Sequence, residues 1–166
     1  MKTLHLLRHA KSSWNDPSLE DIDRPLNQRG KRACKVMGPI IEQQLDQHTV
    51  IACSTATRAQ QTCDRVTKNF ATQFTVNMED SLYTFSSSNL LNYLCALDDE
   101  IQSIMLIGHN PALTDLTNIL SVEPIDNIPT CGYIKTQLPI DKWSALNSSE
   151  GELVAFIKPK DISESC

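Results

Sequence analysis

Short apolar runs alternate with segments of helical apolar spacing over most of this 166-residue chain. Apolar runs of four to eight residues are typical of strands buried in a sheet, whereas apolar residues three and four apart are typical of amphipathic helices. We expect strands at residues 4–7, 49–53, 74–76, 103–107, 133–138 and 153–157. Because helical segments separate most of these strands, the pattern predicts a largely parallel sheet with helices on both faces. The expected fold is therefore an α/β three-layer α/β/α sandwich.

The last two predicted strands, residues 133–138 and 153–157, are joined by a loop rather than by a helix. This connection favours antiparallel pairing, so we expect an antiparallel edge near the C-terminus. The chain has no internal repeat, low-complexity segment or long linker, and its length suits one domain with a sizeable core. We expect residues 1–166 to form a single domain.

Two proline-containing sequences mark expected helix boundaries. The first predicted helix starts near Leu26, and Gly38-Pro39 inside it predicts a kink or a break, because proline lacks the backbone N–H. After residues 103–107, Asn110 is a good N-cap and Pro111 suits the first helical position. We therefore expect another helix to begin there.

The overall composition excludes several classes of function. A net charge of −5 argues against general nucleic-acid binding. No apolar run approaches the length of a membrane span, and the N-terminus lacks a secretory layout. Six cysteines, at positions 34, 53, 63, 95, 131 and 166, form no CxxC pair, which favours reduced thiols over a zinc site. These features predict a cytoplasmic protein that binds neither nucleic acid nor membrane.

The charges are unevenly distributed along the chain. Residues 1–70 contain eleven Lys and Arg against seven Asp and Glu, whereas residues 71–166 contain four against thirteen. An acidic protein of this kind can still hold a locally cationic pocket in its first half. Solvated surface charge explains the asymmetry equally well, so both interpretations stay open.

Three strand ends carry residues that suit an anion-binding site. Arg8 and His9 follow the first strand, Arg58 lies in the first turn after the second, and His109 follows residues 103–107. Carboxyl ends of parallel strands meet at one edge of a sheet, so these four side chains can converge. An arginine side chain can donate several hydrogen bonds to phosphate oxygens at once, and helix N-termini add backbone N–H donors. The set predicts a phosphoryl pocket in which nearby cations keep the His9 imidazole neutral and nucleophilic.

These motifs resemble those of the histidine phosphatase (phosphoglycerate mutase-like) superfamily. The resemblance is carried by Leu7-Arg8-His9-Ala10-Lys11-Ser12, by Ser-x-x-x-Arg-Ala-x-x-Thr at residues 54–62, and by Gly108-His109-Asn110-Pro111. Within that superfamily, the short chain, the segment 23–30 and the pair Leu82-Tyr83 are similar to the SixA branch of phosphohistidine phosphatases. The similarity runs from about residue 3 to residue 120.

The resemblance implies a role for each matching residue. It implies that His9 attacks phosphorus and becomes phosphohistidine, while Arg8, Arg58 and His109 hold the phosphoryl oxygens. Lys11, Ser12 and Asn110 are expected to bind substrate. No metal and no other cofactor are implied.

The expected proton donor is less defined than the nucleophile. Many superfamily members have an acidic residue after the third strand, and here Glu79 and Asp80 are the nearby candidates, followed by Ser81 just before Leu82-Tyr83. Each is better explained as a solvated loop acid than as the proton donor. An imidazole leaves more easily than an alkoxide, so we hypothesise labile phosphoryl substrates such as phosphoramidates.

The chain is accordingly expected to dephosphorylate phosphohistidine in a signalling phosphoprotein. The alternatives are a phosphatase for small phosphoesters or phosphoanhydrides of metabolites, and a non-catalytic module that binds phosphorylated groups. An intact nucleophile at His9 argues against the binding module, since binding requires only the arginines. No second anion site is evident, which argues against a mutase.

Overall fold

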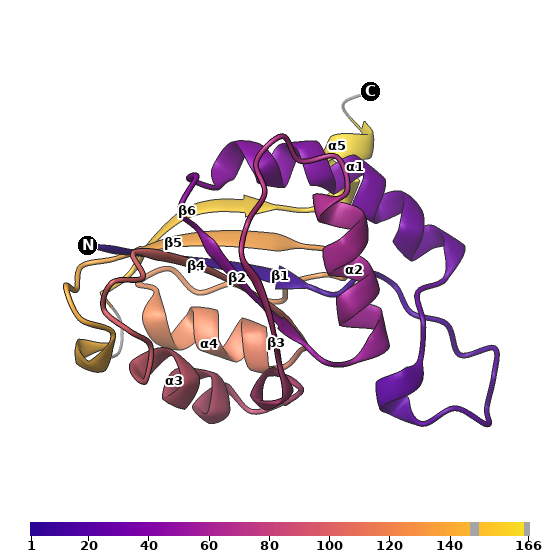
Figure 1. Cartoon of the computed structure of the whole chain (residues 1–166), viewed down its shortest axis with the longest axis horizontal. Coiled ribbons are helices and arrows are strands. Elements are labelled where there is room, and N and C mark those ends of the chain that lie inside the picture. The colour runs from indigo at the N-terminus through magenta and orange to yellow at the C-terminus, as the bar shows by residue number, and fades with distance from the viewer. Residues whose placement is uncertain (147–149, 165–166) are drawn as a thin grey trace.

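A computed structural model describes residues 1–146 and 150–164 and shows a six-stranded sheet between two layers of helices (Figure 1). The strands are β1 (Lys2–Arg8), β2 (Val50–Ser54), β3 (Val76–Glu79), β4 (Ser103–Gly108), β5 (Tyr133–Leu138) and β6 (Glu152–Ile157). Their order is β3-β2-β4-β1-β5-β6, in which β1 to β4 are parallel and β5 and β6 form the antiparallel edge. The predicted fold class is confirmed.

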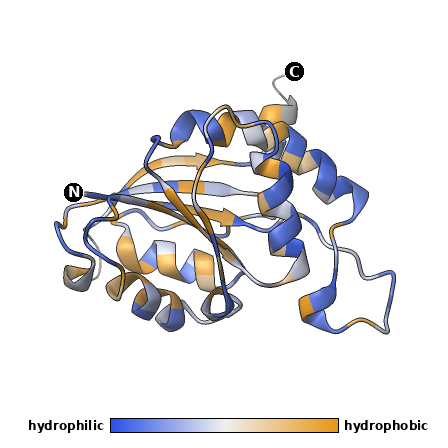
Figure 2. Cartoon of the chain, viewed as in Figure 1, coloured by the Kyte–Doolittle hydropathy of each residue, from blue (hydrophilic) through white to orange (hydrophobic). Residues whose placement is uncertain are grey.

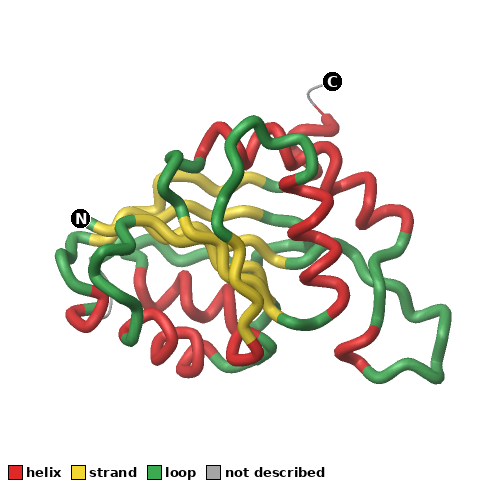
Figure 3. Tube along the Cα trace, in the orientation of Figure 1, coloured by secondary structure: helices red, strands yellow, loops and turns green. Residues whose placement is uncertain are grey.

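The helices are divided between the two faces of the sheet (Figures 1 and 3). The helices α1 (Gln28–Gln44), α2 (Thr57–Thr67) and α5 (Pro159–Glu164) cover one face, and α3 (Ser87–Cys95) and α4 (Ala112–Leu120) cover the other. Short 3-10 turns lie at Asp21–Asp23, Asp80–Leu82 and Trp143–Ala145. The termini of the parallel strands therefore emerge between two helical layers.

Because side chains along β4 alternate between the two faces of the sheet, this one strand contributes to both hydrophobic cores. Ile104 and Leu106 belong to the core under α3 and α4, whereas Met105 and Ile107 belong to the core under α1 and α2. All six residues of β4 are buried, as expected for a central strand with both faces covered. Figure 2 shows the same distribution, with apolar residues on the strands and polar residues on the outer faces of the helices.

Of the kink or break expected at Gly38-Pro39, the break is wrong, because α1 continues through both residues. The proline leaves the carbonyl of the exposed Lys35 without its helical partner, and water can satisfy that carbonyl. Gly38 is buried against α2, where a Cβ atom would lie 2.8 Å from the Val66 carbonyl oxygen. The glycine therefore permits a close approach of the two helices and does not end α1.

Two further boundaries differ from the expected ones. The third strand lies at Val76–Glu79, two residues later than predicted, and α4 begins at Ala112, so Pro111 occupies the N-cap position. The Asn110 carboxamide still caps the helix from one residue earlier, since its Oδ1 accepts the Thr114 N–H at 3.1 Å.

The described cysteines, 34, 53, 63, 95 and 131, are free thiols, while Cys166 lies outside the described residues. A search of the described helices finds none long and apolar enough to cross a membrane.

Candidate active site

The sheet brings the three predicted strand ends together. Strands β2, β4 and β1 are neighbours, and Arg8 at the end of β1 pairs in register with Gly108 at the end of β4. The next residues, His9 and His109, have ring centroids 5.2 Å apart. Arg58 lies in the first turn of α2, which follows β2. The arrangement matches the expected site at the carboxyl edge of a parallel sheet.

The hydrogen bond of His9 defines which ring nitrogen is available. Its Nδ1 lies 2.7 Å from the Ala10 carbonyl oxygen, which can only accept a hydrogen bond. Nδ1 of the neutral ring therefore carries the proton, and Nε2 carries the lone pair. This is the tautomer that a nucleophilic histidine requires.

Burial is the main reason that the His9 imidazole is neutral. The residue is only 8% exposed, and desolvation lowers its pKa from 6.5 to about 4, against the opposing effect of the Ala10 hydrogen bond. The charges of Arg58, Arg8 and Arg24 act with desolvation to give this lowered pKa. The neutral state was expected from the cations alone, and the structure adds desolvation as the larger cause.

His109 is oriented from behind by Ser54. The Ser54 Oγ lies 2.8 Å from Nε2 and also accepts the Ala56 N–H at 3.2 Å, so the hydroxyl proton is free to be donated to Nε2. Nδ1 then carries the ring proton and is a donor. Desolvation and the charges of His9 and Arg58 lower the pKa of His109 to about 3, so it is a neutral donor at neutral pH.

Three buried side-chain nitrogens in the described ranges lack a hydrogen-bond partner, and all three belong to the predicted site. They are Nε of Arg8, Nε of Arg58 and Nδ1 of His109. Buried donors without partners are costly, and they are concentrated where a protein binds a ligand. Three such donors beside the free nitrogen of His9 suit the oxygens of a phosphoryl group.

Asp21 is a site residue that sequence reasoning missed. Its carboxylate lies 2.9 Å from Nη2 of Arg58, accepts a hydrogen bond from Tyr83 at 2.6 Å, and forms an ion pair with Arg24 at 3.2 Å. Desolvation raises its pKa, but the hydrogen bonds from Tyr83 and Arg58 and the charge of Arg58 outweigh this and lower it to about 2. Asp21 is therefore ionised at neutral pH.

Arg24 connects Asp21 to the segment that follows β1. Its Nη1 donates to Ser12 Oγ at 2.7 Å, and its guanidinium lies 3.5 Å from the ring centroid of Trp14. Ser12 is buried by this contact, whereas Lys11 is exposed. Substrate binding by Lys11 and Ser12 stays a prediction.

The Asn110 side chain is fully occupied by the protein. Its Nδ2 donates to Asn127 Oδ1 and to the Ile128 carbonyl, and its Oδ1 accepts two bonds from Thr114. The same Ile128 carbonyl accepts a bond from Nη1 of Arg8 at 2.9 Å. Asn110 thus holds the loop that orients Arg8, and its expected direct contact with substrate stays a prediction.

The two candidate proton donors are placed differently. Glu79 ends β3 next to Ser54 in register, and its carboxylate lies near the hydroxyl of Tyr93. Burial, followed by the effect of Glu79, raises the pKa of Tyr93 to about 12. Asp80, the next residue, is exposed. Proton donation by either Glu79 or Asp80 stays a prediction.

The aromatic residues around His109 form one rim of the site. Tyr83 and Phe85 contact its ring edge-on, at centroid distances of 5.4 and 5.7 Å. Phe85 is nevertheless 49% exposed. Trp14, which lies beside Arg24, is 73% exposed.

Among the described residues, no group of three or more His, Cys, Asp and Glu is arranged to hold a metal ion.

The unpaired donors at the strand ends suit the oxygens of a phosphoryl group. A family model of the histidine phosphatase superfamily (branch 1) matches residues 4–82, which include two of the three strand-end motifs. Over these residues, which make up a little under half of the chain, the sequence is similar to that superfamily.

Relatives of this chain extend over most of its length. An uncharacterized protein of Mycobacterium tuberculosis is 29% identical over 164 residues, which covers 93% of this chain and 100% of that protein. An uncharacterized chloroplastic protein of Arabidopsis thaliana is 28% identical over 151 residues, or 86% of this chain and 69% of that protein.

Solved structures share the fold. SixA of Agrobacterium tumefaciens is 25% identical with a TM-score of 0.75, covering 95% of this chain and 98% of that one. The protein histidine phosphatase SixA in complex with tungstate is 19% identical with a TM-score of 0.78, covering 96% and 98%. A mycobacterial glucosyl-3-phosphoglycerate phosphatase is 13% identical with a TM-score of 0.66, covering 93% and 97%.

Proposed function

We propose that this protein is a phosphohistidine phosphatase that acts on a phosphorylated protein through a phosphohistidine intermediate on His9. The observation that carries the proposal is the His9 imidazole, whose Nδ1–H is bonded to the Ala10 carbonyl, so that Nε2 is free to react. It is supported by the unpaired donors of Arg8, Arg58 and His109, since the two arginine charges act on the His9 ring and the His109 ring lies 5.2 Å from it. A binding module needs the donors but has no use for a histidine held in the nucleophilic tautomer.

In the first step, Nε2 of His9 forms a bond to phosphorus while the phosphorus–nitrogen bond of the substrate breaks. The substrate ring carries a proton on its other nitrogen, so the electron pair of that bond goes to a ring that leaves as neutral imidazole. The two arginines and His109 stabilise the charge on the three phosphoryl oxygens. In the second step, a water oxygen bonds to phosphorus, the bond to His9 breaks, and inorganic phosphate is released.

The charge state of Asp21 favours a substrate with a good leaving group. Asp21 is the carboxylate bonded to Arg58, and a pKa of about 2 keeps it ionised, so it has no proton to donate near pH 7. An alkoxide leaving group needs a strong proton donor, whereas an imidazole does not. This supports phosphoramidates over alkyl phosphates, as does the likeness to SixA structures.

The exposed aromatic rim favours a protein over a small metabolite. Trp14 and Phe85 are both more than two-fifths exposed, although each ring also packs on a side chain of the site. Exposed aromatic residues are enriched at protein–protein contacts, where they provide large rigid surfaces. We assign this rim to the surface that surrounds a phosphorylated side chain on a folded partner.

The proposal is tested by comparing two substrates on three proteins. The substrates are a peptide phosphorylated on histidine with phosphoramidate and an alkyl phosphate such as glucose 6-phosphate. The proteins are wild type, His9→Ala, and His48→Ala, which removes an exposed histidine far along the chain. We expect kcat/KM at least 100-fold higher for the phosphopeptide, loss of activity in His9→Ala, and full activity in His48→Ala. Equal turnover of both substrates would overturn the substrate assignment, and equal activity of His9→Ala would overturn the mechanism.

A further inference from the structure

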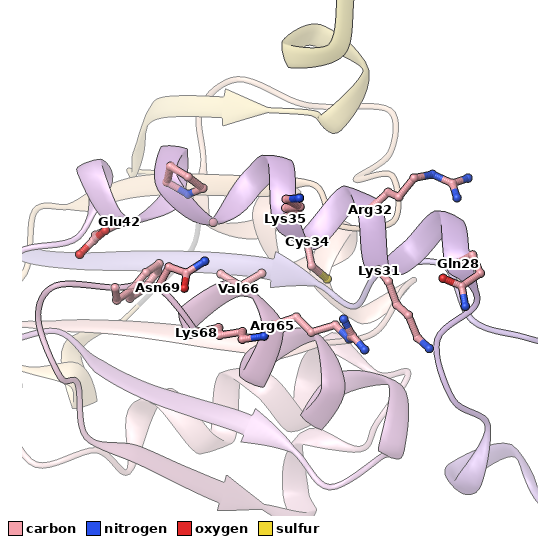
Figure 4. A pocket seen from close by; sticks show the side chains of 13 residues that line it. Gln28, Lys31, Arg32, Cys34, Lys35, Glu42, Arg65, Val66, Lys68 and Asn69 are labelled. Carbon is pink, nitrogen blue, oxygen red and sulfur yellow. The ribbon is translucent and has the colours of Figure 1, made fainter.

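A groove of about 520 Å³ lies between α1 and α2, outside the candidate active site (Figure 4). Five cations line it: Lys31, Arg32 and Lys35 from α1, Arg65 from α2, and Lys68, the residue that follows α2. Lys31 and Arg65 extend from opposite helices into the space between them (Figure 4). A chain with a net charge of −5 thus concentrates one-third of its fifteen Lys and Arg residues around a single groove.

No ion pair among the described residues neutralises these cations. Within residues 1–146 and 150–164, the three ion pairs involve Met1, Arg24 and Arg58, and none involves a cation of the groove. Of the carboxylates that the structure describes, Glu42 alone lines the groove, and it accepts a hydrogen bond from the Ala71 N–H at 2.6 Å. The groove therefore presents uncompensated positive charge, which attracts an anionic partner.

The arrangement of the cations suits an extended anion better than a compact one. Lys31 and Lys35 are one helical turn apart on α1, and Arg65 of α2 lies three residues before Lys68, the C-cap of that helix. The charges thus form two rows along the helices and do not converge on one point. Phe70, which is half-buried, adds apolar surface to the lining of the groove for the methylene groups of a peptide.

The groove begins beside the candidate active site. Arg65 is seven residues after Arg58 on α2, which is roughly 10 Å along a helix axis. On α1, Gly30 packs directly against the Lys11 carbonyl, in the segment that follows His9. A chain whose phosphorylated side chain reaches His9 can therefore extend into the groove.

We propose that this groove binds an acidic segment of the phosphorylated protein substrate, close to the side chain that is dephosphorylated. This inference rests on the proposed function and names a property of the partner, which is a run of Asp or Glu residues. Charge complementarity would lower KM for such a partner and would leave the chemistry at His9 unchanged.

The test uses phosphohistidine peptides of one length with three Glu or three Gln residues on the N-terminal or the C-terminal side. We expect a KM about tenfold lower for one of the acidic peptides, because exposed ion pairs each contribute modestly, and a smaller difference in 0.5 M salt. The variant Lys31→Gln/Lys35→Gln/Arg65→Gln should lose this preference and should hydrolyse p-nitrophenyl phosphate at the wild-type rate. The control Lys142→Gln/Lys158→Gln/Lys160→Gln changes the net charge equally, elsewhere on the chain, and should keep the preference.

Several outcomes would overturn the inference. These are equal KM values for acidic and neutral peptides, an unchanged preference for the acidic peptide in the groove variant, or a loss of that preference in the control variant that equals the loss in the groove variant. If no phosphopeptide is hydrolysed, the proposed function fails, and the groove is tested separately with a fluorescent unphosphorylated Glu peptide by anisotropy. Binding of that peptide that depends on Lys31, Lys35 and Arg65 supports the groove as an acidic-peptide site. Tighter binding of inorganic polyphosphate than of the peptide contradicts it.

Discussion

Asp21 accepts hydrogen bonds from both terminal nitrogens of Arg58, so that only Nε of that guanidinium lacks a hydrogen-bond partner. The Asp21 carbonyl oxygen lies 2.7 Å from Nη1, and its carboxylate lies 2.9 Å from Nη2. The contact ties the long segment after β1 to the start of α2 and fixes the plane of the guanidinium. It connects the stability of this segment to the ionisation of one carboxylate.

Asp21→Asn should destabilise the protein by less than about 1 kcal/mol at pH 7, because the Asp21 side chain is 42% exposed and solvent screens its ion pairs. The pKa of Asp21 is lowered to about 2 in the folded state, below its ordinary value of 3.8. The contribution is therefore complete above pH 4 and disappears as the pH falls toward 2. Urea unfolding of both proteins between pH 7 and pH 3 measures it. A difference that grows on acidification contradicts this assignment.

Arg58→Lys should lower kcat/KM at least 100-fold, although the positive charge is kept. Lysine has no planar fork, so it cannot bond to Asp21 and also direct a second donor at the phosphoryl oxygens. The matched control is Arg65→Lys on the same helix, which should leave hydrolysis of p-nitrophenyl phosphate unchanged. If the two variants are equally active, Arg58 does not bind the phosphoryl group.

The rate should stay high in acid down to an unusually low pH. The pKa of His9 is lowered to about 4, so its nucleophilic neutral form predominates above that pH. We expect kcat/KM for p-nitrophenyl phosphate, corrected for ionisation of the substrate, to fall with a midpoint near pH 4. An NMR titration of ¹³C-labelled histidine, assigned with His9→Ala, should give the same midpoint. A midpoint near 6.5 in both experiments would show that His9 is not desolvated.

Gly30→Ala should destabilise the protein by about 1–3 kcal/mol, because the added Cβ overlaps the Lys11 carbonyl oxygen. Lys11 lies in the segment after His9, so activity should fall as well. Gly108→Ala is the matched control, since its Cβ would meet its nearest neighbour, the Leu82 carbonyl oxygen, at an ordinary 3.7 Å. Thermal unfolding compares the two, and an equal loss in both variants contradicts the steric explanation.

The meeting of Arg8, His9 and His109 could be predicted from sequence because it depends only on parallel strands. Adjacent parallel strands place their carboxyl ends at one edge, whatever the loops between them do. The contacts of Asp21 and Tyr83 depend instead on the path of two irregular segments that have no periodicity. Tyr83 is part of the Leu82-Tyr83 pair, but nothing in the sequence shows which side chain it contacts.

Local sequence patterns were misleading where a tertiary contact determines the backbone conformation. Gly38-Pro39 has the composition of a helix end, yet packing of Gly38 on Val66 keeps α1 continuous. The cause of the His9 pKa shift was likewise only partly predictable. Charged neighbours can be counted in a sequence, but desolvation depends on how completely the folded chain covers the ring.

The central claim is that His9 carries the phosphoryl group during turnover. The most direct measurement is to stop the reaction of a ³²P-labelled phosphohistidine peptide with alkali during turnover and to map the label by digestion. We expect acid-labile, base-stable phosphate on the peptide that contains His9, in wild type and in His48→Ala but not in His9→Ala. Turnover without any protein-bound label, or label on a residue other than His9, would contradict the account.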